Sequence, residues 1–113
     1  MTISAEKLEV AILAILRHHK GKLEVSMNGQ YGWLDLVREH LGEILDPLKI
    51  ESALKRLRSD GIVCLTQYNP DIGVRFEYRA GESDDRVFFR RWNFEVAITE
   101  EGRGYLGGGT RSN

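Results

Sequence analysis

One segment in the middle of this 113-residue chain combines both ends of a helix with the start of a strand. Asp46-Pro47 is typical of a helix start, because Asp caps free amides and Pro fits the first turn. Asp60-Gly61 is typical of a helix end, because glycine tolerates the left-handed conformation. At Ile62 the apolar spacing changes from that of a helix to that of a strand. The chain must therefore combine both kinds of structure. The apolar residues between the two helix ends recur at helical spacing: Ile50, Ala53, Leu54 and Leu57.

A helix is also predicted near the start of the chain, over residues 4–21. Ser4 is placed to cap it, and Lys20-Gly21 to close it. Residues 10–16 form an unbroken apolar run, so this helix is apolar nearly all round. Such a helix is either covered on two sides within the core or shared with a second chain, and we expect the first arrangement.

Two short elements are predicted between these helices. Leu23 and Val25 alternate with polar residues, which favours a short strand within residues 21–30. Residues 31–41 return to helical spacing, with Gly42 as a natural stop.

Strands are predicted for most of the chain after Gly61. Residues 62–66 are β-branched and apolar, and residues 74–79 alternate apolar and charged side chains. A long last strand is expected from Phe88 to Ile98, followed by a short helix capped at Thr99. We therefore expect one α+β domain over residues 1–106 and a flexible tail over residues 107–113.

The order of the predicted elements resembles that of the winged helix-turn-helix. It runs helix, strand, two helices joined by a tight turn, and then a β-hairpin. The resemblance to repressors of the MarR and PadR kind lies in residues 50–65 and 97–106. It implies a three-helix core with an antiparallel β wing, here enlarged by an extra strand, and a short C-terminal helical turn. A long C-terminal dimer helix of the repressor kind is not found in the sequence. The residues that match the family's motifs are Leu54, Leu57, Gly61, Ile62, Val63, Thr99, Glu101, Gly102, Arg103 and Leu106.

In a helix-turn-helix the second helix enters the major groove, and here that helix is residues 47–60. It carries four basic and two acidic residues, whereas residues 1–46 carry five basic and seven acidic ones. The basic excess is thus focused on one element, although the whole chain has a net charge of −1. A solvated helix face explains a small excess nearly as well. The predicted DNA-binding residues on this helix all face outward: Lys49, Ser52, Lys55, Arg56 and Arg58.

The hairpin region offers two further kinds of candidate. Arg75 and Arg79 suit phosphate contacts, but cross-strand ion pairs with Glu77 account for them equally. Trp92 and Phe88 are candidates for a dimer or partner contact.

No pattern points to catalysis, a cofactor or a metal site. The sequence lacks phosphate-binding loops and nucleophile motifs, and Cys64 is a single cysteine expected to be buried in a strand. His18 and His19 are adjacent on a helix and therefore diverge, which serves a metal ion poorly.

Two functions compete. The first is sequence-specific DNA binding by a small, dimeric, cytoplasmic winged-helix regulator that contacts double-stranded DNA and no membrane. The second is a winged-helix module for protein–protein contact, which the near-neutral charge and the aromatic hairpin region favour.

Overall fold

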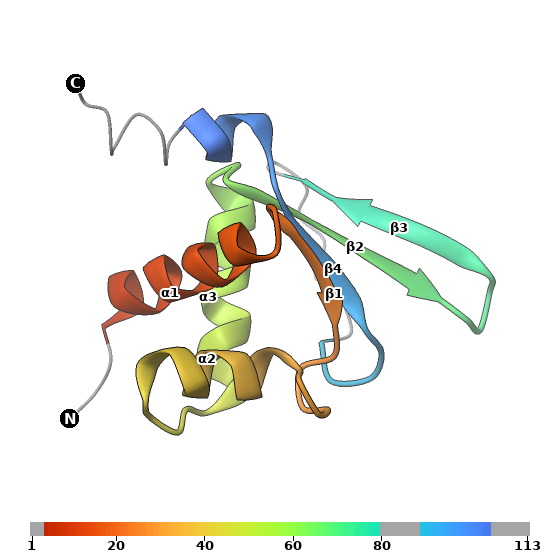
Figure 1. Ribbon diagram of the computed structural model, residues 1–113. Coiled ribbons are helices and arrows are strands. Elements are labelled where there is room, and N and C mark those ends of the chain that lie inside the picture. Colours follow the sequence, from red (N-terminus) through yellow and green to blue (C-terminus); the bar gives the residue numbers. More distant parts are fainter. Residues whose placement is uncertain (1–3, 80–88, 105–113) are drawn as a thin grey trace.

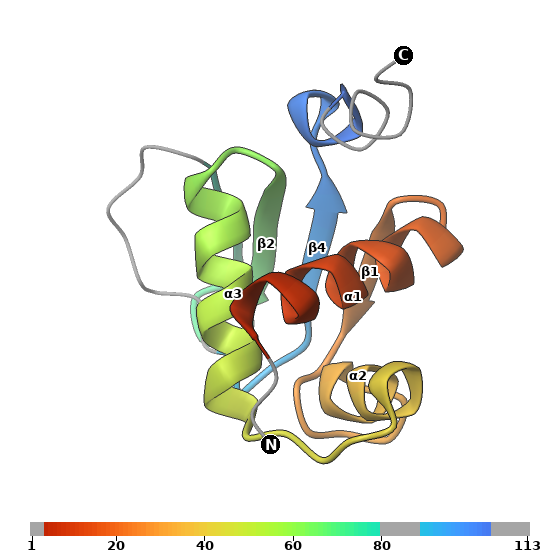
Figure 2. The same cartoon turned by 90° about the vertical axis from the view of Figure 1, so that its left-hand side faces the viewer.

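The computed structural model describes residues 4–79 and 89–104, and they form an α+β fold. Three helices lie on one side of an antiparallel sheet, and the β2–β3 hairpin extends away from them (Figure 1). Seen from the helical side, α1 crosses in front of the sheet between α3 and α2 (Figure 2). A helical stretch at residues 100–104 follows the last strand. The elements in chain order are α1 (Ala5–His18), β1 (Lys22–Val25), α2 (Trp33–Leu41), α3 (Pro47–Ser59), β2 (Val63–Asn69), β3 (Val74–Tyr78) and β4 (Phe94–Ile98).

The sheet has the strand order β1-β4-β2-β3, so β1 and β3 are its two edges. Leu65 of β2 pairs with Tyr78 on one side and with Val96 on the other, and Val96 pairs in turn with Leu23. Because directly paired residues of antiparallel strands share a face, this row lies on the side of the sheet that packs on the helices. The α+β class predicted from the sequence is confirmed, and the order of elements is compatible with a winged helix.

The core lies between the sheet and the three helices. Its largest fully buried side chains come from every layer, and burial of each contributes about 1.5–3 kcal/mol to stability. The apolar run of α1 is covered within this one chain, as expected, apart from the exposed Val10 and the half-buried Ala14. The fully buried set includes Ile12, Leu16, Trp33, Val37, Ile50, Leu54, Leu57, Leu65, Phe94 and Val96.

The predicted helix ends are confirmed at α3, and α1 ends slightly early. The Asp46 carboxylate accepts the amide of Leu48 at 2.9 Å, and Gly61 takes a φ of +79° directly after the helix. Helix α1 stops at His18, and the left-handed Lys20 and Gly21 turn the chain into β1.

The long last strand was predicted wrongly. Strand β4 begins only at Phe94, because its partners β1 and β2 pair with it along Phe94–Ile98 alone. Upstream of β4 the chain turns, and the ring of Phe89 packs edge-on against Phe94 at 5.0 Å. Phe88 and the expected tail lie outside the described residues.

Candidate nucleic-acid interface

Helix α3 presents the candidate surface. Its inward residues Ile50, Leu54 and Leu57 are fully buried against the other layers, which fixes the opposite side outward. Leu48, Ser52 and Ser59 are exposed there. This outward strip, with its flanking side chains, is called the α3 face below: Leu48, Lys49, Ser52, Lys55, Arg56 and Ser59.

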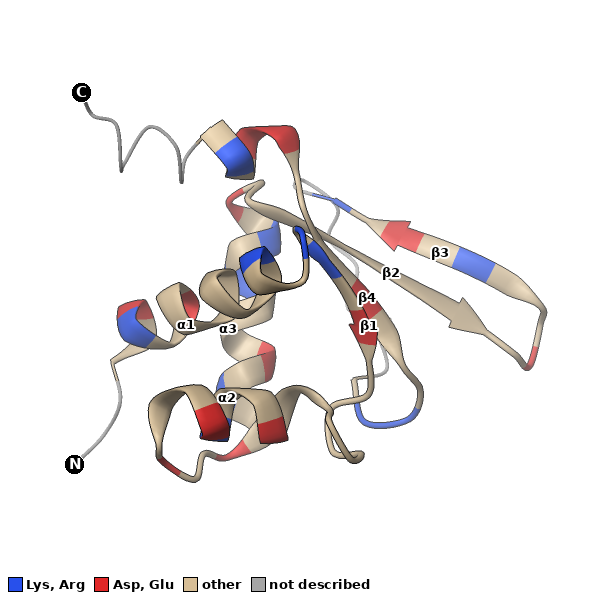
Figure 3. Ribbon diagram, in the orientation of Figure 1, with Lys and Arg blue, Asp and Glu red and all other residues tan. Residues whose placement is uncertain are grey.

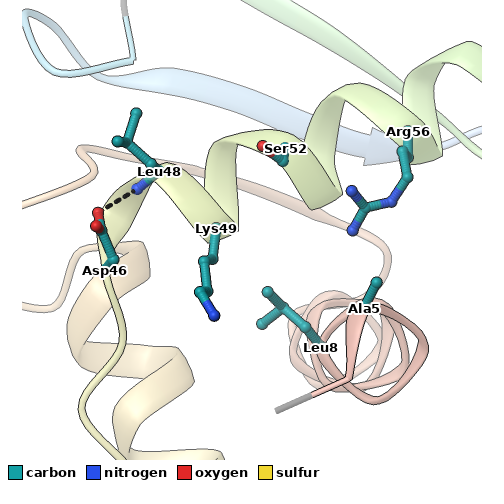
Figure 4. A pocket seen from close by; sticks show the side chains of 7 residues that line it. All are labelled: Ala5, Leu8, Asp46, Leu48, Lys49, Ser52 and Arg56. Carbon is teal, nitrogen blue, oxygen red and sulfur yellow. Dashed lines mark hydrogen bonds between the residues drawn. The ribbon is translucent and has the colours of Figure 1, made fainter. Parts of the chain in front are cut away.

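One flank of the α3 face forms a groove against the start of α1. The groove has a volume of about 380 Å³ and is lined by apolar residues of α1 and polar residues of α3. Lys49 and Arg56 extend from α3 on the side of the groove that α1 occupies (Figure 4). The Arg56 Nε donates to a carboxylate oxygen of Glu9 at 2.7 Å. A cation of the α3 face is therefore held by an acid from the neighbouring helix. The groove is lined by Ala5, Leu8, Asp46, Leu48, Lys49, Ser52 and Arg56.

The other flank of the α3 face meets the turn that precedes β4. The Lys55 ammonium lies 5.9 Å from the ring centre of Phe89, and the Arg90 Nε donates to Glu51 at 3.0 Å. Buried Gln67 donates to the carbonyls of Trp92 and Asn93, at 3.4 and 3.3 Å, which anchors this turn to β2. Arg90 thus becomes a neighbour of α3, although it is 39 residues away in sequence.

Arg58 does not belong to the α3 face, contrary to the sequence-based expectation. Its residue exposure is 7%, and it lies beside the buried Leu54 on the helix surface. A helix position at the margin of an apolar stripe is covered or exposed according to what packs beside it. Helical spacing alone placed Arg58 outward, and the packing that covers it comes from other parts of the fold.

Arg75 and Arg79 are also not brought together with the α3 cations. By the strand pairing, Arg75 and Glu77 share a face with Thr66 and Glu95, which is the face turned away from the helices. Arg75 contacts Glu24 of β1 at 3.5 Å, and Arg79 contacts Glu77 at 2.9 Å. Both arginines have acidic partners, but not the expected cross-strand ones: Arg75 pairs with Glu24 and not Glu77, and Arg79 pairs with Glu77 of its own segment.

Of the two candidate contact residues, Phe88 lies outside the described residues and Trp92 is only partly exposed. Trp92 is half-buried, and the Arg91 guanidinium lies 4.6 Å from its ring centre. Instead Tyr68, Ile72 and Val74, at the end of the β2–β3 hairpin, are 47%, 60% and 43% exposed. The alternation pattern marked the two strands correctly but did not show that the core stops short of the hairpin tip.

Charges of both signs are interspersed over the described surface (Figure 3). Around α3, Arg56 is paired with Glu9 and Arg90 with Glu51, and Asp46 lines the groove together with Lys49. Any anion that binds here must either use the exposed cations directly or displace an acid from its partner.

Neither metal binding nor thiol chemistry is favoured among the residues that the structure describes. Residues 4–79 and 89–104 contain no group of three or more His, Cys, Asp or Glu side chains that could hold a metal ion. Cys64 is buried in β2, and burial raises the pKa of its thiol, which disfavours a reactive thiolate. None of the described helices is both long and apolar enough to cross a membrane.

In comparisons with protein families, with curated proteins and with solved structures, nothing matches this chain.

Proposed function

We propose that this protein is a winged-helix DNA-binding protein, with α3 as the helix that enters the major groove. One observation carries the proposal: α3 is the second helix of a pair joined by a short turn, and its outward side holds Lys49, Ser52, Lys55 and Arg56. A hairpin follows α3 directly, as in a winged helix-turn-helix. This is the arrangement by which such helices present side chains to base edges.

The proposal gives the residues of the α3 face different roles. Ser52, Lys55 and Arg56 lie within the part of the helix that reaches bases, and their donors suit the acceptors of guanine and thymine. Lys49 near the helix start and Arg90 on the flanking turn hold phosphates. Arg90 replaces Arg58 among the predicted DNA contacts, because Arg58 is buried.

The acids near α3 limit the strength of this binding. Arg56 must exchange Glu9 for a nucleic-acid acceptor, and Arg90 must do the same with Glu51. With two phosphate contacts per copy, from Lys49 and Arg90, we expect log K to fall with log salt with a slope of about −2.

The test is fluorescence anisotropy of labelled mixed-sequence duplexes over a salt titration. Replacing both Lys49 and Lys55 by alanine should weaken binding at least tenfold and make the salt slope shallower by about one, because Lys49 is the phosphate contact of the two. Lys22→Ala is the matched control, since Lys22 lies on β1 and pairs with Ala97 on the sheet face turned away from the helices. Absence of binding at low salt, or equal losses in the double variant and the control, would rule the proposal out.

One observation favours the second candidate, a protein-interaction module without DNA binding. The hairpin tip exposes Tyr68, Ile72 and Val74 and carries the acid Asp71, whereas a DNA-binding wing needs basic residues. The two candidates separate in the same titration. A module that binds only protein gives no anisotropy change at any salt concentration.

A further inference from the structure

Strand β3 leaves one edge of the sheet without a partner. It pairs with β2 on one side, and within residues 4–79 and 89–104 no strand pairs with its other side. An edge of this kind presents a row of backbone donors and acceptors that a further strand can use. The β2–β3 hairpin extends away from the helices, so its tip stands clear of the three-helix layer (Figure 1), whereas Tyr78 at the other end of β3 is buried in the core.

We propose that this edge is the surface through which two copies of the chain associate, by antiparallel pairing of β3 with the β3 of a second copy about a two-fold axis at Phe76. The five residues Val74–Tyr78 read apolar, basic, apolar, acidic, apolar. An antiparallel pairing centred on Phe76 therefore sets Arg75 of each copy directly across from Glu77 of the other. On the opposite face it sets Val74 across from Tyr78 and the two Phe76 rings across from each other. The strand is thus complementary to itself in charge and in apolar character.

The two ion pairs that these residues now make do not oppose the association. Arg75 contacts Glu24 and Glu77 contacts Arg79, and the side chains of both pairs are between 38% and 57% exposed. Exposed pairs of this kind contribute little, so each residue can change partner at small cost.

The exposed apolar side chains at this end of the sheet favour the association of two copies. On one face Val74 is 43% exposed and Phe76 is half-buried, Ile72 is exposed in the turn before them, and Tyr68 is exposed on the other face, where it pairs with Arg75. Pairing along β3 brings the two hairpins together and covers part of this surface. Because the axis is perpendicular to the sheet, the two sheets join into one with the helices of both copies on the same side.

The other edge of the sheet is the competing surface. Lys22 and Glu24 flank Leu23 on β1, so this strand also reads basic, apolar, acidic. It has only four residues, and its apolar residues Leu23 and Val25 are packed against the core. No exposed large apolar residue lies on it, whereas three lie on or next to β3. The apolar surface that association would cover is therefore at β3.

The experiment is sedimentation velocity of the full chain at protein concentrations from about 1 µM to 1 mM, the range in which small interfaces associate. The wild-type protein should show a monomer–dimer equilibrium. Arg75→Glu and Glu77→Arg each place like charges across the axis, so each variant alone should weaken dimerisation at least tenfold. An equal mixture of the two variants should form a heterodimer, because each supplies the charge that the other now needs. The double variant R75E/E77R should dimerise like the wild type.

Recovery in the mixture shows that the single variants are folded and that the two positions face each other. Lys22→Glu is the matched control on the other edge and should leave dimerisation unchanged. The proposal fails if the wild type stays monomeric throughout, if the single swaps dimerise normally, or if the mixture does not associate. Loss of the dimer on Lys22→Glu alone would assign the interface to β1 instead. The experiment contains no DNA, so its outcome is independent of the proposed function.

Discussion

At the scale of single residues, the segment Thr99–Gly102 joins the end of β4 to the junction between α3 and β2. The Thr99 hydroxyl donates to the carbonyl of Gly61 and accepts the amide of Gly102 at 2.9 Å. The Thr99 amide donates to the carbonyl of Ile62 at 3.0 Å. The glycine of this motif is required for space, since a Cβ at Gly102 would collide with the backbone carbonyl of Ile62.

We predict that Gly102→Ala destabilises the protein by about 2–3 kcal/mol, because backbone rather than a flexible side chain must move to make room. Gly104→Ala is the matched control, since a Cβ at Gly104 meets nothing within 4 Å. That substitution should change stability by less than about 1 kcal/mol. Urea unfolding followed by circular dichroism measures both variants. Equal stability of the two would show that the contact at Gly102 relaxes without cost.

At the same scale, Arg58 shows that a basic residue type alone does not indicate a DNA contact. Its charge and its place on a basic helix suggested a DNA contact, but its side chain is buried beside Leu54. Arginine stems pack well on apolar surface, so a basic residue next to an apolar stripe can belong to the core margin. A helical projection places Arg58 close to Leu54 and could have raised this possibility, but which neighbour covers it depends on tertiary packing.

At the scale of elements, the sequence predicts best those features that are determined by residues close together in the chain. Helix α3 has the bounds expected from Asp46-Pro47 and Gly61 because caps act within one turn. The last strand was predicted too long, because alternation shows only that a strand would be amphipathic. Whether it forms depends on partner strands, and these are far away in the sequence. The contacts of Arg56 with Glu9 and of Arg90 with Glu51 join different elements for the same reason and could not be predicted.

The ion pair between α1 and α3 yields a prediction about binding. Glu9→Gln removes the acid that holds Arg56, and we expect it to tighten DNA binding about three- to tenfold. Stability should change by no more than about 1 kcal/mol, because the pair is partly exposed. Anisotropy titrations at fixed salt measure the affinity.

Glu6→Gln is the control for this effect. It also removes one negative charge from α1, and Glu6 and Glu9 line the same groove, but it is the Glu9 carboxylate that holds Arg56. If Glu6→Gln tightens binding as much as Glu9→Gln does, general charge accounts for the gain and release of Arg56 does not.

At the scale of the whole molecule, a net charge of −1 is compatible with DNA binding only if the contacts are concentrated on one face. The α3 face brings Lys49, Lys55 and Arg56 together with the exposed Ser52. The nearby acids Glu9 and Glu51 keep the affinity of one copy for DNA low. Pairing of two copies through β3 would double these contacts and raise the affinity for a two-part site. The proposed function and the proposed dimer thus support each other, although each is tested alone.

The most direct measurement is a titration of isotopically labelled protein with a short DNA duplex, followed by the shifts of its backbone amides in NMR spectra. The account predicts that the largest shifts fall on residues 47–56 and on the turn at residues 89–91, and that they diminish as salt is added. Residues of the sheet face turned away from the helices and outside β3, such as Lys22 and Glu95, should shift little. Shifts confined to the hairpin around Ile72, or no shifts at low salt, would contradict the claim that α3 is the DNA-binding helix.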